Sequence, residues 1–125
     1  MRKSKNQFIF SASDLSNHIH CKHSTKLNKD VVDGLLEKSI NNNRVLDLLR
    51  ERGVEFENAF LSSIEAQGHS IIKIDTNETD AQQKTINAML QGIDYIYQAR
   101  LCNDKWQGWA DFLVKVLIPS KLGDW

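Results

Sequence analysis

Residues 44–68 read RVLDLLRERGVEFENAFLSSIEAQG, and this stretch predicts the longest structural element of the chain. Its apolar residues recur with the 3.6-residue period of a helix and so fall on one stripe; they are Leu46, Leu49, Phe56, Phe60 and Ile64. The asparagines at 41–43 offer a cap before it, and Gly68 stands where a helix C-terminus favours glycine. We expect one helix over 44–67, with this stripe facing the core.

Shorter elements are expected before this helix. Residues 1–7 are polar and predicted to be frayed. A helix capped by Ser11 or Ser13 is predicted to run to about Cys21, and a second helical segment to cover residues 28–43.

The residues after the long helix predict a strand, a helix and a hairpin. The strand covers 70–75, and the next helix is capped by Asn77 and ends at Gly92. Two further strands, 93–102 and 106–117, flank a turn. The order indicates a mixed α+β fold, in which a last hairpin without a further strand makes a marginal sheet.

Composition is that of an ordinary globular protein, with 125 residues, 41% hydrophobic and 26% charged. The formal net charge of zero gives no overall field that would attract nucleic acid. Residues 1–29 are basic, however, and within them Lys22 and Lys26 are candidate DNA contacts. There is no secretory signal, no apolar run long enough for a membrane span and no cysteine framework, so we expect a cytoplasmic protein.

Glu57 is the first candidate functional residue. On a helical wheel it lies about 20° from Leu46 and Ile64, whereas Glu55 points about 160° away from it. A carboxylate on a core-facing stripe is costly unless it is paired or binds metal. The alternatives are an ion pair with Arg50 and simple placement at the boundary of the core.

Asp111 is the second candidate. It lies in the strand 106–117 between Trp109 and Leu113, although aspartate is a poor strand former. A salt bridge to Lys115 is the alternative explanation.

Together, Glu57 and Asp111 suggest a cation site. Hydrolysis of a phosphodiester with Mg²⁺ needs carboxylate oxygens that converge on a hard cation. We therefore expect the two carboxyl groups, on a helix and on a strand, to lie within roughly 8 Å of each other.

The segment His18-Ile19-His20-Cys21-Lys22-His23 invites comparison with zinc sites. A structural zinc needs four ligands, and no second ligand pair stands at a recognised spacing. We favour a polar helix end with a buried cysteine.

Four segments resemble, in their order, a family of RecB-like nucleases akin to the CRISPR-associated RecB-like exonucleases. They are Phe10-Ser11-Ala12-Ser13-Asp14-Leu15 followed by Cys21, Arg52-Gly53-Val54-Glu55-Phe56-Glu57, Ile96-Tyr97-Gln98-Ala99, and Trp106-Gln107-Gly108-Trp109-Ala110-Asp111-Phe112-Leu113. The resemblance covers residues 8–125. It implies an incomplete restriction-endonuclease-like PD-(D/E)XK core over 44–125, preceded by a basic helical segment over 1–43.

The resemblance also implies roles for individual residues. Asp111 matches the strand aspartate that binds Mg²⁺ or Mn²⁺, and Glu57 matches a histidine or glutamate ligand on the helix. Cys21 matches the first of four cysteines that hold an iron–sulfur cluster in some relatives, so it is a candidate ligand in a longer parent only. The implied partners are DNA and a superfamily 1 helicase domain in the same or a neighbouring polypeptide.

One motif of the superfamily has no counterpart in this chain. None of its 16 acidic residues is followed two positions later by lysine, whereas the superfamily requires (Asp/Glu)-x-Lys on the next strand. We therefore expect an N-terminal fragment of a nuclease that does not cut DNA unaided. Two alternatives are a DNA- or partner-binding remnant of a nuclease domain and an unrelated small α+β interaction module.

Overall fold

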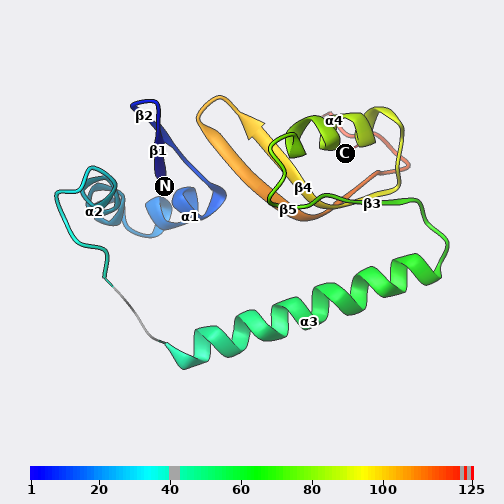
Figure 1. Ribbon diagram of the computed structural model, residues 1–125, viewed down its shortest axis with the longest axis horizontal. Coiled ribbons are helices and arrows are strands. Elements are labelled where there is room, and N and C mark those ends of the chain that lie inside the picture. The colour runs from blue at the N-terminus through cyan, green and yellow to red at the C-terminus, as the bar shows by residue number, and fades with distance from the viewer. Residues whose placement is uncertain (40–42, 122, 124) are drawn as a thin grey trace. The chain divides into compact units, whose positions relative to one another are not determined.

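The computed structural model describes residues 1–39, 43–121, 123 and 125. The chain divides into two compact units, Met1–Asn41 with Cys102–Gly108 and Asn42–Leu101 with Trp109–Trp125. Helices and strands both contribute to the chain (Figure 1), which has the mixed α+β character that its sequence predicts.

A small hairpin opens the first unit. β1 (Arg2–Ser4) pairs antiparallel with β2 (Gln7–Ile9), and both residues between them have positive φ, 45° at Lys5 and 64° at Asn6. Two such residues make a type I′ turn, whose twist matches the strands that it joins. The expectation that residues 1–7 are frayed is therefore wrong, because this turn lacks the glycine that usually signals it.

α1 (Ala12–His20) begins after Ser11, as predicted. The backbone N–H and the hydroxyl of Ser11 both donate to the Asp14 carboxylate at 2.8 Å, and the N-terminal ammonium of Met1 pairs with it at 2.7 Å. Burial raises the pKa of Asp14, but hydrogen bonds from the ammonium and from Ser11 outweigh this and hold the pKa below its usual 3.8. The start of α1 is thus tied to the first residue of the chain.

α2 (Lys22–Val32) differs from the helical segment predicted over residues 28–43. It begins earlier because Cys21 has an extended backbone, which separates it from α1. It ends earlier because Gly34 adopts a φ of 76°, a left-handed conformation that ends helices. Positions 40–42 of the predicted segment lie outside the described residues.

α3 (Arg44–Ala66) is the long helix expected from the sequence. Asn43 caps it by accepting a hydrogen bond from the Val45 N–H at 3.0 Å. Leu61 and Ile64 are buried near its C-terminal end. The apolar residues of its N-terminal half are exposed, among them Leu46, Leu49 and Phe56.

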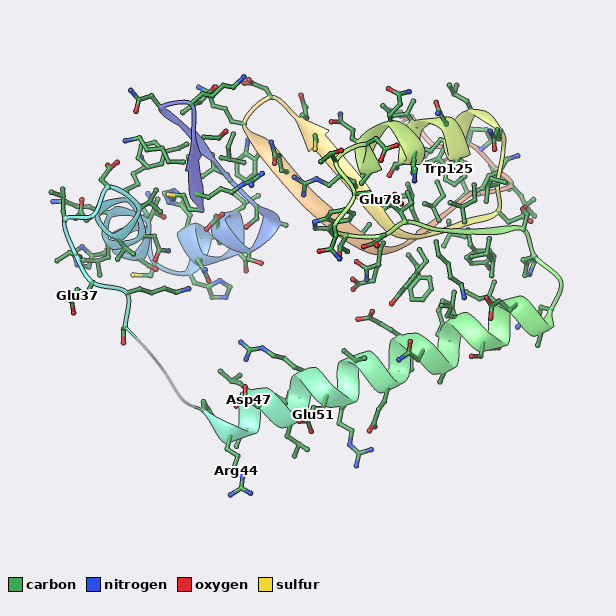
Figure 2. The ribbon with its side chains drawn as sticks, viewed as in Figure 1. Glu37, Arg44, Asp47, Glu51, Glu78 and Trp125 are labelled. Atoms are coloured by element: carbon green, nitrogen blue, oxygen red, sulfur yellow. The ribbon has the colours of Figure 1, made fainter. Side chains whose placement is uncertain are left out.

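The expectation that the whole apolar stripe of α3 faces a core is therefore wrong. Phe60 packs edge-on against Phe112 of the sheet at 4.8 Å, and the large apolar side chains of the turns before it are exposed. Figure 2 shows the labelled Arg44, Asp47 and Glu51 on this N-terminal half. The helical period identified the stripe, but it could not tell how far along the helix the packing extends.

The sheet of the second unit has the strand order β3-β4-β5. β3 (Ile71–Lys73) is parallel to β4 (Tyr95–Asn103), and β5 (Trp106–Val114) returns beside β4 after a short turn. α4 (Ala81–Leu90) connects β3 to β4, and in Figure 1 it lies on the opposite face of the sheet from α3.

The best-packed core lies between the sheet and α4. Its buried residues are Ile74, Ala81, Ala88, Ile96 and Ala99. Trp125, labelled in Figure 2, also packs against this cluster. Tyr97 and Phe112 lie on the other face of the sheet, where they contact Glu57 and Phe60 of α3.

α4 begins later than predicted. The Asp75 carboxylate accepts hydrogen bonds from the backbone and the side-chain amide of Asn77 at 2.9 and 3.0 Å, so Asn77 lies in a turn and Asp80 is the residue that precedes the helix. The end of α4 agrees with the sequence, since Gly92 follows it with a φ of 72°. Within the described part of the chain, every helix is too short or too polar to cross a membrane.

Candidate metal site

Glu57 projects from α3 toward the sheet. Its side chain is half-buried, and its Oε2 accepts a hydrogen bond from the Tyr97 hydroxyl of β4 at 3.3 Å. Glu55 is exposed and pairs instead with Arg52 on the same helix at 2.9 Å. The helical wheel therefore chose correctly between the two glutamates.

Gln98 connects Glu57 to Asp111. Its side-chain nitrogen Nε2 lies 3.5 Å from Oε2 of Glu57 and 3.3 Å from Oδ1 of Asp111. Because both oxygens lie around one nitrogen, they are no more than 6.8 Å apart. The prediction that these two carboxylates approach within about 8 Å, although they are far apart in sequence, is confirmed.

The two ion pairs considered as alternatives for these acids are not among the described contacts, whereas the half-buried position of Glu57 agrees with the alternative of a boundary residue. Arg50, the proposed partner of Glu57, pairs with Asp47 at 2.9 Å. Lys115, the proposed partner of Asp111, lies beside Gly92, where an added Cβ would be 3.1 Å from its ammonium nitrogen. Neither carboxylate of the site is thus accounted for by the predicted ion pair.

The basic group of Lys115 acts on Asp94 instead. Hydrogen bonds from the hydroxyl and the backbone of Ser70 are the main cause of the lowered pKa of Asp94, and the positive charge of Lys115 adds to it. These contacts join the starts of β3 and β4.

A β-bulge at Gln98 shapes the site. Gln98 has a φ of 57°, a left-handed conformation in the middle of β4. Ile96 and Ala99, three positions apart, are both fully buried in the core beside α4, whereas regular alternation would pair Ile96 with Gln98. The extra residue therefore lets Tyr97 and Gln98 both contact Glu57.

Sequence reasoning missed the parts played by Tyr97 and Gln98 here. The available signal was the spacing of Ile96 and Ala99, since two small or β-branched apolar residues three apart do not share a face in an unbroken strand. Aromatic packing completes this side of the site, with Tyr97 against Phe112 at 5.1 Å.

The donor set suits a hard cation. Glu57 and Asp111 present carboxylate oxygens, which are the ligands that Mg²⁺ prefers over nitrogen and sulfur, while the Tyr97 hydroxyl and the Gln98 Nε2 donate hydrogen bonds to them. Among the described residues, no group of three or more His, Cys, Asp and Glu side chains is placed to hold a metal ion. The carboxylate pair alone therefore makes a partial site, and a complete one needs further ligands.

The histidines around Cys21 form local hydrogen bonds. His18 shares a hydrogen bond with the Thr25 hydroxyl at 2.8 Å, and His20 with the Ser16 carbonyl at 2.7 Å. Cys21 is exposed at the junction of α1 and α2, so the expectation of a buried cysteine is wrong. Cys21 and Cys102 are both free thiols.

The candidate DNA contacts Lys22 and Lys26 are both exposed on α2. Their spacing of one helical turn puts them on the same side of the helix. Two other basic residues of the unit are engaged, since Lys3 pairs with Asp33 at 2.6 Å and Lys29 lies over the ring of Phe8 at 5.6 Å.

Comparisons with known proteins found no relative of this chain. No protein-family model matches the chain, no curated protein matches it, and no solved structure matches it.

Proposed function

We propose that this chain supplies the first metal-binding residues of a Mg²⁺- or Mn²⁺-dependent DNA nuclease of the RecB-like PD-(D/E)XK type. The observation that carries the proposal is the approach of Glu57 and Asp111 across Gln98. One acid comes from a helix packed on the sheet and the other from a strand, which is the arrangement that the family resemblance implies. The segment 44–125 is then the early part of the nuclease core.

Each residue has a defined task in this proposal. Glu57 and Asp111 would hold the cation, which supplies an activated water and neutralises charge on the phosphate. Tyr97 orients the Glu57 carboxylate through its hydroxyl. Attack on phosphate also needs a lysine to position the water, and this chain has no (Asp/Glu)-x-Lys to provide it. The 125-residue chain should therefore bind metal without cutting DNA.

The test uses the coding sequence beyond Trp125. A protein extended through an in-frame (Asp/Glu)-x-Lys motif should cleave DNA when Mg²⁺ or Mn²⁺ is added. Asp111→Asn should abolish cleavage, because asparagine keeps the shape of the side chain and removes its charge. Asp104→Asn, in the turn of the same hairpin, is the matched control and should cleave normally.

Two results would reject the nuclease proposal. One is an extended protein that folds and binds both metal and DNA but leaves linear and circular DNA intact. The other is an Asp111→Asn protein that cleaves as fast as the Asp104→Asn control.

A DNA-binding remnant of a nuclease domain is the second candidate, and the exposed pair Lys22 and Lys26 favours it. Such a protein would bind DNA weakly and with strong salt dependence, since its contacts would be to phosphates. Metal separates the two candidates. The nuclease proposal requires that Asp111→Asn weaken cation binding, whereas DNA binding through α2 does not involve Asp111.

A further inference from the structure

Helix α3 exposes a row of large apolar side chains on either side of one glycine, Gly53. The exposed fractions in this row are 43% for Leu46, 61% for Leu49, 73% for Phe56 and 40% for Phe60. On a helical wheel all four residues lie within about 60° of Gly53. We call these five residues the Gly53 face. A contiguous exposed apolar patch of this kind marks an interaction surface.

Gly53 itself indicates close approach by another helix. It lies inside α3, where glycine makes the helix less stable than alanine would. A Cβ added at Gly53 would meet no atom within 4 Å among the described residues, so no packing within this part of the chain requires its absence. The side chains at a helix–helix contact set the distance of roughly 8–10 Å between the two axes, and a glycine there permits the shorter distances.

The Gly53 face is nearly symmetric about its glycine. Leu46 and Phe60 stand seven positions to either side of Gly53, while Leu49 stands four positions before it and Phe56 three positions after it. If two copies cross antiparallel at Gly53 around a two-fold axis, Leu49 of each copy therefore lies against Phe56 of the other. Such self-complementarity is what a symmetric dimer requires.

The charges beside the Gly53 face are complementary in the same arrangement. Arg52 and Glu55 form an ion pair within one helix at 2.9 Å, and their side chains are 73% and 65% exposed. In the antiparallel arrangement, Arg52 of one copy lies within one residue of being level with the partner's Glu55, or about 1.5 Å along the helix axis. Each arginine can therefore pair with the partner's Glu55 in place of its own, and no charge is left unpaired.

The available area suits a weak dimer. With about 200 Å² for a fully exposed large side chain, the four apolar residues offer about 400 Å² per copy. The aliphatic stems of Arg52 and Glu55 add to this, so a pair of copies buries about 1,000 Å², the lower limit for a specific interface. Because Glu57 and Phe60 already contact the sheet, we expect the helices to cross at about 50°, the commonest angle, which makes their ends diverge.

We propose that the Gly53 face binds the same face of a second copy of this chain, with the two α3 helices antiparallel and crossing at Gly53. The proposal is separate from the proposed nuclease function, because it does not depend on metal binding by Glu57 and Asp111.

Sedimentation equilibrium of the 125-residue chain tests the proposal. The mass should rise from the 14.3 kDa of one chain to twice that value as the protein concentration passes a Kd of about 1–100 µM, as expected for a small interface. Amide hydrogens in the first turns of α3 should exchange more slowly as the dimer forms. Phe56→Gln should weaken dimerisation about 10–100-fold, since aromatic residues near the centre of an interface contribute most to binding. Glu51→Gln, about 160° from Gly53 on the wheel, is the matched control and should dimerise as the wild-type chain does.

Gly53→Gln separates dimerisation from folding. Glutamine is a better helix former than glycine, so this variant should melt at least as high as the wild-type chain in dilute solution. Its side chain would hold the two helices apart, and dimerisation should weaken at least about 10-fold. A variant that is equally well folded but less associated is the expected result.

A charge exchange tests the antiparallel arrangement. Arg52→Glu and Glu55→Arg should each weaken dimerisation, because each places like charges opposite one another across the interface. An equimolar mixture of the two variants should dimerise more tightly than either variant alone, since both pairs between the copies are then of opposite charge.

Three results would overturn the proposal. The first is a wild-type chain that keeps a mass of 14.3 kDa up to about 1 mM, and a lower melting temperature for Phe56→Gln would then show that the face packs within its own chain. The second is a dimer that Phe56→Gln and Gly53→Gln leave unchanged, which would place the association elsewhere, such as at an open sheet edge. The third is a mixture of the two charge variants that dimerises no more tightly than either alone.

Discussion

The Glu57 carboxylate should lower the stability of the protein when no cation is present, and Glu57→Gln tests this. The oxygens of Glu57 and Asp111 are at most 6.8 Å apart, and two unit charges at that distance repel by about 0.6 kcal/mol at the dielectric constant of water and about 2.4 kcal/mol at an effective value of 20. Asp111 is exposed, so the lower figure is the better guide. Glutamine retains an oxygen that can accept from Tyr97 and Gln98.

We therefore expect Glu57→Gln to stabilise the metal-free protein by roughly 0.5–1 kcal/mol, or about 2–5 °C in melting temperature. The measurement is urea unfolding followed by tryptophan fluorescence in the presence of a chelator. Glu55→Gln is the matched control, since this exposed carboxylate pairs with Arg52 on the surface and should change stability by less than about 0.5 kcal/mol.

Adding Mn²⁺ should make the wild-type protein more stable than Glu57→Gln, which is the reverse of the order expected without metal. A cation that binds only the folded protein raises its free energy of unfolding, and at concentrations above Kd this increase grows with the logarithm of the cation concentration. Glu57→Gln should lose most of this stabilisation because it lacks one of the two carboxylates. The reasoning fails if Glu57→Gln destabilises the metal-free protein by more than about 1 kcal/mol, because Glu57 would then be a structural hydrogen-bonding residue. It also fails if both glutamine variants respond to Mn²⁺ as the wild-type protein does.

Three further predictions concern the core, the N-terminus and the basic surface. Ile64→Ala should cost about 2–5 kcal/mol in urea unfolding, because Ile64 is 2% exposed, whereas Ile86→Ala at 40% exposure should cost far less; equal losses would contradict the packing of α3. The lowered pKa of Asp14 means that its charge stabilises the folded state above pH 3.8 and that this contribution is lost as the pH falls through the folded pKa. Asp14→Asn should thus make the free energy of unfolding depend less on pH in the acid range. An unchanged dependence on pH would show that the Asp14 carboxylate does not contribute to stability. Replacing Lys22 and Lys26 by glutamine should reduce the slope of log K for DNA against log salt by roughly 2, and a fluorescence-anisotropy series with an unchanged slope would exclude these contacts.

Helix α3 was predictable because its determinants are local. Its period, the cap at Asn43 and the left-handed glycine at Gly68 all lie within the helix or next to it. The same period did not show which part of the stripe would be buried, since that depends on where the sheet ends. Ile64 is buried and Leu49 is exposed, although both lie on the predicted stripe.

The missed features depend on backbone conformations that the residue types do not signal. Lys5 and Asn6 form a tight turn without glycine, and Gln98 adopts a positive φ inside a strand. In each case the neighbouring strands impose the conformation. The start of α4 was predicted too early for a related reason. The Asp75 carboxylate accepts a hydrogen bond from the Asn77 N–H in a turn, so Asn77 is not the cap of the helix.

The candidate site was only partly predictable. The helical wheel singled out Glu57, and the strand setting singled out Asp111, because a charged residue among apolar ones is conspicuous in either element. Their approach to each other was expected only when both were assigned to one cation. Gln98 escaped notice because a glutamine in a strand is unremarkable until the bulge shows which way it points.

The burial gradient along α3 also determines how the helix should move. Backbone amides in its first turns are covered by few neighbours, so their hydrogens should exchange with solvent through fraying, while those around Leu61 and Ile64 should exchange only when the unit opens. Glu57 lies where these two regimes meet. Its carboxylate is therefore attached at the boundary between the exposed half of the helix and its buried end.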